Sequence, residues 1–215
     1  MPMRSPDAPT LDTLGGTRTL ALMATEAEYG PALAARLSPV LIGVGPVEAA
    51  VNTTRALAAL ERAGTPPALA LSIGSAGSNR LAQGSVHRVA SVSWRDIDAS
   101  PLGFARGTTP FLDLPAERSL PELAPTLPTA RLSTGGNVIP NPAAYAAIDA
   151  DMVDMETYAV LRACEAYGVA LAGLRAVSDG DAELGGYGDW GDALPVLDER
   201  LAEAVDALAA DLAAR

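Results

Sequence analysis

The chain of 215 residues is long enough for one domain with a substantial core, and it carries 15 basic against 26 acidic residues, a formal net charge of −11. This acidic balance excludes ordinary binding to nucleic acid and disfavours an anionic membrane surface, because both partners attract a surplus of cationic side chains. All basic residues are arginine, and the chain has one cysteine (Cys164) and one histidine (His87), which excludes a Schiff-base or P-loop lysine, a disulfide framework and zinc sites built from several Cys or His residues.

The first half of the chain alternates between predicted strands and helices. Residues 1–16 contain three prolines and two glycines without an apolar stretch, so we expect a flexible leader and not a signal peptide. Strands are expected at residues 17–23, 40–44 and 69–73, with helices at 26–37 and 47–63. The Gly-Ser-Ala-Gly run at residues 74–77 is either a plain tight turn or a place where backbone N–H groups approach an anion or a sugar oxygen.

The second half continues the same alternation. Strands are expected at residues 86–94, 130–134, 150–154 and 169–177, and helices at 142–148, 156–167 and 194–213. Residues 96–127 are rich in Pro and Gly and are long for a structureless loop, so we expect them to fold partly over a site. The pattern predicts a three-layer α/β domain over residues 17–215, with a mostly parallel, mixed central sheet flanked by helices.

Polar or Gly-rich clusters follow four of the predicted strands, at residues 25–28, 74–78, 154–156 and 178–181. Sheets of this kind bind ligands at the carboxyl ends of their strands, so the clusters predict one site built from carboxylates. Taken singly, each carboxylate has a structural explanation: Glu28 as a charge in the first turn of a helix, Glu156 as a helix cap and Asp179 as a turn residue. His87, on an alternating strand, is interpreted as structural.

Short motifs after these strands point to a known family. They read ATEAE at residues 24–28, GVGPVEAA at 43–50, IGSAG at 73–77, DMETY at 154–158 and RAVSD at 175–179. With them the chain resembles the purine nucleosidase and phosphorylase superfamily, most closely the methylthioadenosine/S-adenosylhomocysteine nucleosidases, from about residue 20 to the C-terminus. The resemblance implies a nucleoside phosphorylase-like fold, a purine nucleoside as small-molecule ligand, a homodimer, and neither cofactor nor metal. The lone cysteine and the absence of a targeting segment predict a cytoplasmic location.

The resemblance also implies roles for particular residues. Asp179 matches the aspartate that protonates the leaving purine at N7, and Ser178 would orient it by hydrogen bonding. Glu28 matches the glutamate that positions and deprotonates the attacking water. Glu156 would accept hydrogen bonds from the ribose 2′- and 3′-hydroxyls, and Met155 would pack against the sugar.

Further binding residues are expected around the base. Residues 134–139 (TGGNVI) resemble the base-binding loop of the family, with Val138 standing where an aromatic side chain commonly stacks on the purine. The valine indicates either a different contact with the base or a stack supplied by Trp94 or Trp190. The substrate-binding residues predicted beside Glu156, Met155 and Ser178 are Ser75, Ala76, Gly77, Val138, Ile139 and Trp190.

Two alternatives to hydrolysis stay open. Phosphorylases of the superfamily hold phosphate with arginines, one of them just before the Gly-Ser turn, and residues 71–74 (LSIG) contain none. Hydrolysis is therefore favoured over phosphorolysis, with Arg80 and Arg106 left as candidates to reach a phosphate from elsewhere. A non-catalytic nucleoside-binding relative is the third reading, and the presence of all three carboxylates speaks against it.

Residues 96–111 resemble the loop that completes the pocket of a neighbouring subunit. In that position they would set the specificity for the 5′-substituent of the nucleoside. Methylthioadenosine, adenosylhomocysteine, adenosine, inosine and futalosine-like compounds all remain open as substrates.

Overall fold

The computed structural model describes residues 3–180, 182–183 and 185–215. Its strands are β1 (Asp12–Leu14), β2 (Thr17–Met23), β3 (Val40–Leu41), β4 (Leu69–Gly77), β5 (Val86–Trp94), β6 (Glu117–Ser119), β7 (Thr129–Thr134), β8 (Met152–Asp154) and β9 (Ala170–Asp179). Its helices are α1 (Pro31–Ala34), α2 (Pro46–Arg62), α3 (Pro142–Tyr145), α4 (Thr157–Ala166) and α5 (Tyr187–Ala213), with 3₁₀ turns η1 (Glu26–Glu28) and η2 (Ser100–Leu102).

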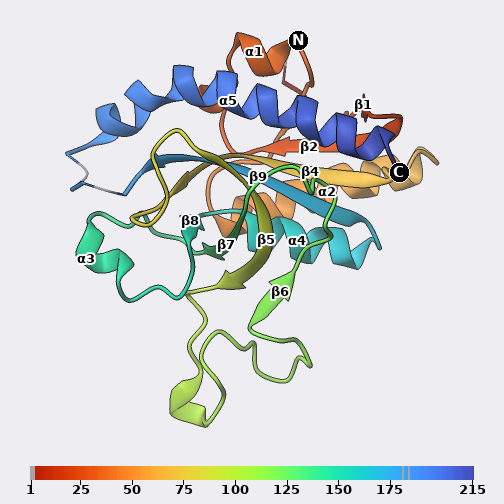
Figure 1. Ribbon diagram of the computed structural model, residues 1–215. Helices are drawn as coiled ribbons and strands as arrows, with labels where there is room; N and C mark the ends of the chain where they lie inside the picture. The colour runs from red at the N-terminus through yellow and green to blue at the C-terminus, as the bar shows by residue number, and fades with distance from the viewer. Residues whose placement is uncertain (1–2, 181, 184) are drawn as a thin grey trace.

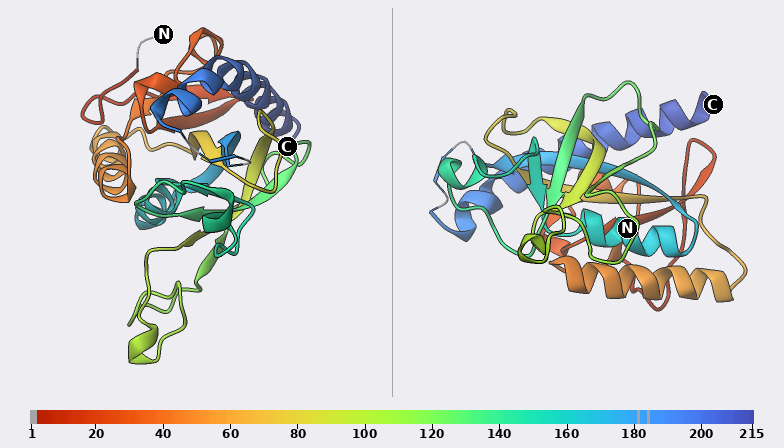
Figure 2. Two further views of the ribbon diagram at one scale, coloured as in Figure 1. Left: turned by 90° about the vertical axis from the view of Figure 1, so that its left-hand side faces the viewer. Right: turned by 90° about the horizontal axis from the view of Figure 1, so that it is seen from below.

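The sheet separates two layers of helices (Figure 1). Strand β2 packs against both layers of helices, because successive side chains of a strand point to opposite faces of the sheet. Leu20 and Leu22 pack in the cluster that contains the buried residues of α2 and α4. Ala21 and Met23 pack instead with the buried residues of α5. The three-layer arrangement predicted from the apolar strands is confirmed, and Figure 2 shows it from the side.

The sheet is mixed, and part of it closes on itself. Parallel pairs join β4 to β2 and β9, and join β7 to β5 and β8. Antiparallel pairs join β4 to β8 and β5 to β9, so the path β4–β8–β7–β5–β9 returns to β4. At one point of this ring Gly77, at the end of β4, is the partner of both Val153 in β8 and Asp179 in β9. The closure therefore brings three strand ends together.

The N-terminal segment differs from the predicted leader. Residues 12–14 form β1, which pairs antiparallel with β2, and Arg4 donates hydrogen bonds to the carboxylate of Asp12 and makes a bridge to Val40. The predicted boundary at residue 17 thus falls inside a hairpin, whose turn is made by Gly15 and Gly16 at positive φ. The three-residue strand is too short to show an alternating pattern in the sequence.

Three other predicted elements have different bounds. The predicted helix at residues 26–37 is broken into η1 and α1, with Gly30 and Pro31 at the break. Of the two readings of residues 74–77, the tight turn is excluded, because β4 continues to Gly77 through its pairing with β9. Helix α5 begins at Tyr187, seven residues before the predicted start, and it includes Pro195 in its interior. Within the described residues, no helix is both long and apolar enough to cross a membrane.

The connection between β5 and β7 is partly folded, as expected, but no residue of the range 96–127 lines the cavity described below. It contains η2 and β6, and β6 pairs with the outer edge of β5. The segment that carries η2 projects away from the body of the domain as an arm (Figure 2). We call residues 96–111 the arm.

A buried carboxylate connects α5 to the break between η1 and α1. Asp198 of α5 accepts hydrogen bonds from the backbone N–H groups of Gly30 (3.1 Å), Ala32 (2.8 Å) and Leu33 (3.0 Å). Helix α1 is only four residues long, and its N-cap residue Gly30 has no side chain to cap these groups. Asp198 therefore acts as the N-cap of α1 from another helix.

Replacing Asp198 with alanine is expected to lower the free energy of unfolding by about 2–4 kcal/mol, because three buried N–H groups lose a charged acceptor. Urea denaturation measures this loss. The control is Asp206→Ala, which removes an exposed ion pair with Arg36 and is expected to cost less than about 1 kcal/mol. Equal losses in the two variants would contradict the capping role.

Candidate active site

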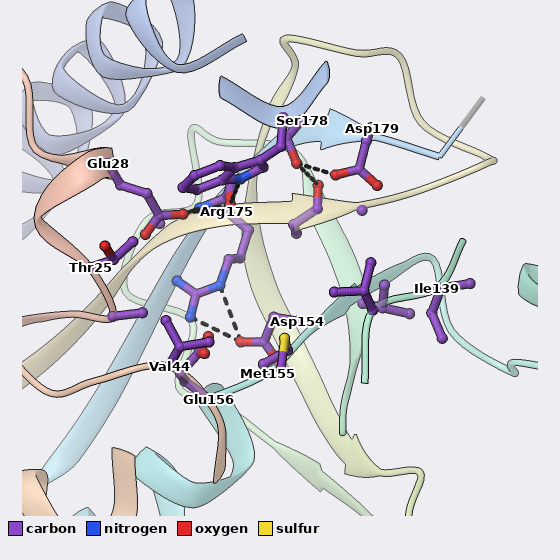
Figure 3. Close-up of a pocket in the computed structure, with 18 of the residues that line it drawn as sticks. Thr25, Glu28, Val44, Ile139, Asp154, Met155, Glu156, Arg175, Ser178 and Asp179 are labelled. Atoms are coloured by element: carbon purple, nitrogen blue, oxygen red, sulfur yellow. Dashed lines mark hydrogen bonds and ion pairs between the residues drawn. The ribbon is translucent and has the colours of Figure 1, made fainter. Parts of the chain in front are cut away.

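A cavity of about 550 Å³ lies where the ends of β4, β8 and β9 meet (Figure 3). Every predicted catalytic and binding residue lines it: Glu28, Ser75, Ala76, Gly77, Val138, Ile139, Met155, Glu156, Ser178, Asp179 and Trp190. Of the predicted cluster at residues 178–181, Asp181 lies outside the described residues. The fold thus brings together side chains that are up to 162 positions apart, from Glu28 to Trp190.

Glu28 enters the cavity from η1, directly after β2. Its Oε1 atom accepts hydrogen bonds from the backbone N–H of Ser75 (2.8 Å) and from the hydroxyl of Ser75 (2.5 Å). The indole N–H of Trp190 in turn donates to Ser75 Oγ at 3.1 Å. Burial raises the pKa of Glu28, and its hydrogen bonds with Ser75 oppose this rise. The carboxylate is aimed at β4, so a charge in the first turn of a helix does not describe its surroundings.

Glu156 enters from the opposite side, between β8 and α4. It stands at the N-cap position of α4, but its side chain makes no capping hydrogen bond. Its Oε1 atom accepts instead from the backbone N–H of Gly45 at 2.9 Å. Burial, followed by the negative charge of Asp154, raises the pKa of Glu156 to about 7. The carboxyl therefore takes up its proton near neutral pH.

Gly45 is a residue whose role the sequence did not reveal. Its φ angle is +93°, a left-handed conformation that a residue with a side chain rarely adopts. This conformation turns its N–H toward Glu156 just before α2 begins at Pro46. A Gly-x-Gly pair alone is too common to indicate such a contact.

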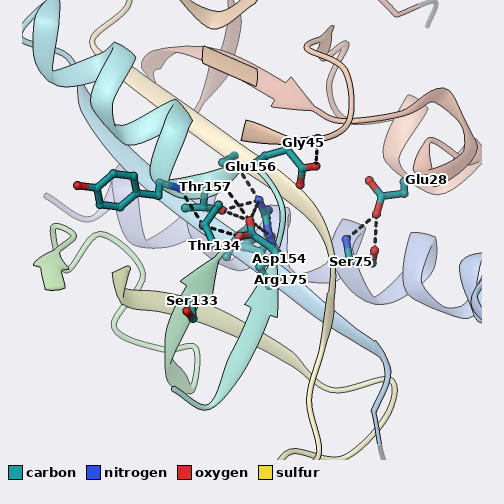
Figure 4. Close-up of polar contacts among 12 residues, drawn as sticks. Glu28, Gly45, Ser75, Ser133, Thr134, Asp154, Glu156, Thr157 and Arg175 are labelled. Carbon is teal, nitrogen blue, oxygen red and sulfur yellow. Dashed lines mark hydrogen bonds and ion pairs between the residues drawn. The ribbon is translucent and has the colours of Figure 1, made fainter. Parts of the chain in front are cut away.

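Asp154 and Arg175 form a buried ion pair beneath the cavity (Figure 4). Their closest atoms, Arg175 Nη2 and Asp154 Oδ2, are 3.0 Å apart, and the side chains are 3% and 1% exposed. Arg175 Nη2 also lies 2.8 Å from Ser72 Oγ and 2.6 Å from Thr157 Oγ1. Asp154 accepts from the backbone N–H of Thr157 at 2.9 Å, so Asp154 has the capping role that was the structural explanation considered for Glu156.

Asp179 is the last residue of β9 and is half-buried. Its Oδ2 atom lies 2.5 Å from the hydroxyl of Ser178, as the predicted orienting contact requires. Its Oδ1 atom accepts a hydrogen bond from the hydroxyl of Tyr145 at 3.2 Å. Tyr145 was not predicted as a site residue, because it lies in a short helical turn whose sequence carries no functional pattern.

The loop after β7 is held by a second residue that the sequence did not indicate. Arg95 donates to the backbone carbonyls of Ser133 (2.6 Å), Asp154 (3.0 Å) and Asn137 (2.6 Å). These bonds tie the loop that carries Val138 to the ends of β7 and β8. Val138 is 63% exposed at the mouth of the cavity.

Of the two tryptophans proposed to cover a base, Trp190 lines the cavity and Trp94 does not. Trp94 stacks on Tyr158 at a ring-centroid distance of 5.8 Å, in the cluster of α2 and α4. Trp190 makes an edge contact with Tyr187 at 5.3 Å, and Tyr187 also lines the cavity. Helix α5 thus supplies Tyr187 and Trp190, which form an aromatic wall of the cavity.

The arginines named as phosphate candidates lie elsewhere. Arg80 donates to the carbonyls of Ala150 and Ile148, and Arg106 pairs with Asp98 on the arm. Among the described residues that line the cavity, the arginines are Arg95 and Arg175, and they donate hydrogen bonds to carbonyls, hydroxyls and Asp154.

In residues 3–180, 182–183 and 185–215, no group of three or more His, Cys, Asp or Glu side chains is placed to hold a metal ion. His87 lies outside the cavity lining, with Nε2 2.9 Å from Ser85 Oγ, and burial lowers its pKa.

Comparison with known proteins gives a consistent family. The model of the phosphorylase superfamily matches residues 24–210. A 5′-methylthioadenosine/S-adenosylhomocysteine nucleosidase of Actinobacillus succinogenes is 29% identical over 161 residues, which cover 66% of this chain and 68% of the relative.

Solved structures share the fold at lower identity. A futalosine hydrolase mutant of Helicobacter pylori superposes with a TM-score of 0.74 at 18% identity, covering 88% of this chain and 97% of that one. A methylthioadenosine/S-adenosylhomocysteine nucleosidase of Colwellia psychrerythraea, in complex with adenine, superposes with a TM-score of 0.75 at 18% identity, covering 94% and 97%. The predicted nucleoside phosphorylase-like α/β fold is confirmed.

The raised pKa of Glu156 predicts a pH-dependent cost in stability. The folded state holds the proton of Glu156 up to about pH 7, which is more tightly than the unfolded chain does. This tighter proton binding stabilises the folded state at low pH, and the stabilisation is lost as the pH rises through 7. Glu156→Gln keeps the oxygen that faces Gly45 but removes the charge. The variant is expected to be more stable than the wild type by up to about 3 kcal/mol near pH 8, and by less than about 1 kcal/mol near pH 5.

Urea denaturation at both pH values measures this difference. The control is Glu203→Gln, which alters an exposed ion pair with Arg200 and is expected to change stability by less than about 1 kcal/mol at either pH. If Glu156→Gln changes the free energy of unfolding by the same amount at both pH values, burial does not raise the pKa of Glu156.

Proposed function

The chain belongs to the phosphorylase superfamily, and we propose that it hydrolyses the N-glycosidic bond of a purine nucleoside to the free base and a ribose derivative. The observation that carries this proposal is the convergence of Glu28, Glu156 and Asp179 around one cavity. Cleavage of such a bond passes through a ribosyl cation, and carboxylates stabilise that cation and move the protons it requires.

Asp179 serves as the acid for the leaving group. As the C1′–N9 bond breaks, the purine takes both bonding electrons, and Asp179 gives N7 the proton that makes the base a neutral leaving group. The contact with Ser178 holds the carboxyl at the end of β9, where the cavity lining includes both residues. The adenine complex of the Colwellia relative supports a purine base in this fold.

Glu28 serves as the base for the attacking water. Its two hydrogen bonds from Ser75 fix the carboxylate against β4 and leave Oε2 for a water molecule. The pKa of Glu28 is raised by burial, which makes the carboxylate a stronger base than an exposed one. Water adds its oxygen to C1′ and its proton passes to Glu28, so the protons given and taken at the two carboxyls balance.

Glu156 binds the sugar between these two groups. In its ionised form the carboxylate accepts hydrogen bonds from the ribose 2′- and 3′-hydroxyls and offsets the positive charge that develops on the ring. Met155 precedes it and lines the cavity, where it packs on the apolar side of the sugar. The backbone of Val138 and Ile139 reads the edge of the base, and Trp190 covers it.

Water is favoured over phosphate as the nucleophile. Arg175 is paired with Asp154, Arg95 with backbone carbonyls, and Arg80 and Arg106 lie outside the cavity lining. A phosphate dianion is held best by arginines whose donors are free to point at it. Glu28 and Glu156 would in addition repel that dianion.

The substrate we propose is a purine nucleoside with an enlarged 5′-substituent, of the methylthioadenosine, adenosylhomocysteine or futalosine type. The similar proteins from Actinobacillus, Colwellia and Helicobacter carry these names. The cavity of about 550 Å³ lies within the range of about 300–1,000 Å³ that is usual for small-molecule sites. Val44 and Tyr187 line the cavity and are 54% and 75% exposed, so they offer apolar contact to part of such a 5′-group.

We also propose a homodimer in which the arm of one chain completes the pocket of the other. The arm exposes Leu102 (78%) and Phe111 (94%), and Phe111 meets Phe104 edge-on at 5.5 Å. Val47 and Val51 lie one turn apart on α2 and are exposed, and Val44, just before this helix, is exposed and lines the cavity. Apolar surface of this kind beside an open pocket is typical of an interface. A cytoplasmic location stays a prediction.

Incubation of the wild-type protein with a panel of purine nucleosides in phosphate-free buffer is expected to release the free base and a reducing sugar. Chromatography separates these products from the ribose 1-phosphate that a phosphorylase would form. Asp179→Asn is expected to lower kcat by roughly 10²–10⁴-fold, because the leaving base loses its proton donor. Base release only on addition of phosphate would favour phosphorolysis, and no release with any nucleoside would favour a binding protein without turnover.

The shared pocket can be tested by mixing two defective chains. Phe111→Ala is expected to lower the activity of the partner pocket, and Asp179→Asn that of its own pocket. Because a mixed dimer has one pocket with both an intact Asp179 and an intact arm, activity is expected to rise above the sum of the two variants alone. Sedimentation velocity checks that each variant is a dimer. A monomeric wild type, or a mixture no more active than its parts, would refute the shared pocket.

A further inference from the structure

Tyr145 contacts Asp179, yet neither the motifs nor the proposed roles account for it. It lies in α3, directly after the loop that carries Val138 and Ile139, and it lines the cavity. Its side chain is 4% exposed and packs with Ile139 and Val153. The hydroxyl nevertheless reaches past this apolar cluster and donates to Asp179 Oδ1 at 3.2 Å.

The space for this hydroxyl depends on Gly77. A Cβ atom at position 77 would lie 2.0 Å from the hydroxyl oxygen of Tyr145 and 2.9 Å from Asp179 Oδ1. Both distances are too short for any side chain. Gly77 belongs to β4 and does not have a positive φ, so glycine is needed here for room and not for backbone conformation. The strand end is thus shaped to admit the tyrosine.

The hydroxyl of Tyr145 remains a donor. Burial, together with the neighbouring Asp179, raises the pKa of Tyr145 above its ordinary value, so the phenol keeps its proton under all ordinary conditions. The other oxygen of Asp179 lies beside the hydroxyl of Ser178. Each carboxyl oxygen therefore has one hydroxyl, and the plane of the carboxyl group is fixed from two sides.

We propose that Tyr145 is a positioning residue for leaving-group protonation, which it supports by donating a hydrogen bond to Asp179. The inference rests on the proposed function. When Asp179 transfers its proton to N7, the carboxyl becomes an anion, and a donor already aimed at Oδ1 stabilises that anion as it forms. Tyr145 keeps its own proton throughout, and the proton balance of the reaction is unchanged.

A comparison of two substrates separates this role from packing. A purine nucleoside requires a proton on its leaving group, whereas 4-nitrophenyl β-D-ribofuranoside loses a nitrophenolate that departs without one. Tyr145→Phe keeps the ring that packs with Ile139 and Val153 and removes only the hydroxyl. We expect kcat for the purine nucleoside to fall on the order of 10–100-fold with KM changed by less than about 3-fold, the size of a lost hydrogen bond to a charged group. The nitrophenyl riboside is expected to react within about 3-fold of the wild-type rate, since Asp179 is not needed as an acid there.

The matched control is Tyr167→Phe, at the end of α4 and outside the cavity lining, which is expected to leave both rates unchanged. Equal losses on the two substrates, or no loss on either, would overturn the inference. Adding Tyr145→Phe to Asp179→Asn supplies an independent measurement, because a residue that acts through Asp179 adds no further loss once Asp179 is gone. A multiplied loss in the double variant would assign Tyr145 to packing alone.

The wild type distinguishes this failure from failure of the proposed function. If wild-type protein releases base and Tyr145→Phe does so equally well, the role of Tyr145 is wrong and the proposed function stands. If wild-type protein releases base from no purine nucleoside, both are wrong.

Discussion

The buried ion pair between Arg175 and Asp154 is the contact on which the site depends. It joins β9 to β8, and through Ser72 and Thr157 it also holds β4 and the first turn of α4. The three strands each end in a residue that lines the cavity: Gly77 in β4, Asp154 in β8 and Asp179 in β9. Removing one partner of such a pair leaves a charge buried without compensation, which costs about 3–5 kcal/mol in other proteins. The geometry of the carboxylates is therefore tied to the stability of the sheet.

The same pair sets the electrostatics of the cavity. Glu28 and Glu156 are both removed from water, both feel the negative charge of Asp154, and Glu156 also feels that of Glu28. The guanidinium of Arg175 opposes these effects on both groups. Burial is nevertheless the largest influence, so the pKa values of both glutamates rise. A site with this balance attracts a cationic transition state and resists an anionic nucleophile.

The sequence predicted the site better than it predicted the elements around it. Carboxylates at the ends of apolar strands are a local pattern that the sequence shows directly. The closed ring of strands then brings the strand ends, and with them these side chains, close together. The tight turn that the sequence allowed at residues 74–77 does not form, because β4 has paired neighbours on both sides, which keep even a Gly-rich segment extended. Tyr145, Arg95 and Gly45 escaped prediction for a related reason. Their roles lie in contacts with carbonyls and carboxylates more than 30 positions away, and no local spacing encodes such contacts.

The two halves of the proposed reaction are held by different parts of the fold. The acid Asp179 belongs to the ring of strands, whereas the base Glu28 sits in a three-residue turn outside the ring. That turn has little stability of its own, since short helices are costly to form. Helix α5 stabilises it from two positions: Asp198 holds the chain after Tyr29, and Trp190 contacts the Ser75 hydroxyl that bonds Glu28. One long helix therefore both fixes Glu28, the proposed general base, and supplies the aromatic wall of the cavity. The proposed cover over the substrate and the position of Glu28 thus depend on the same helix.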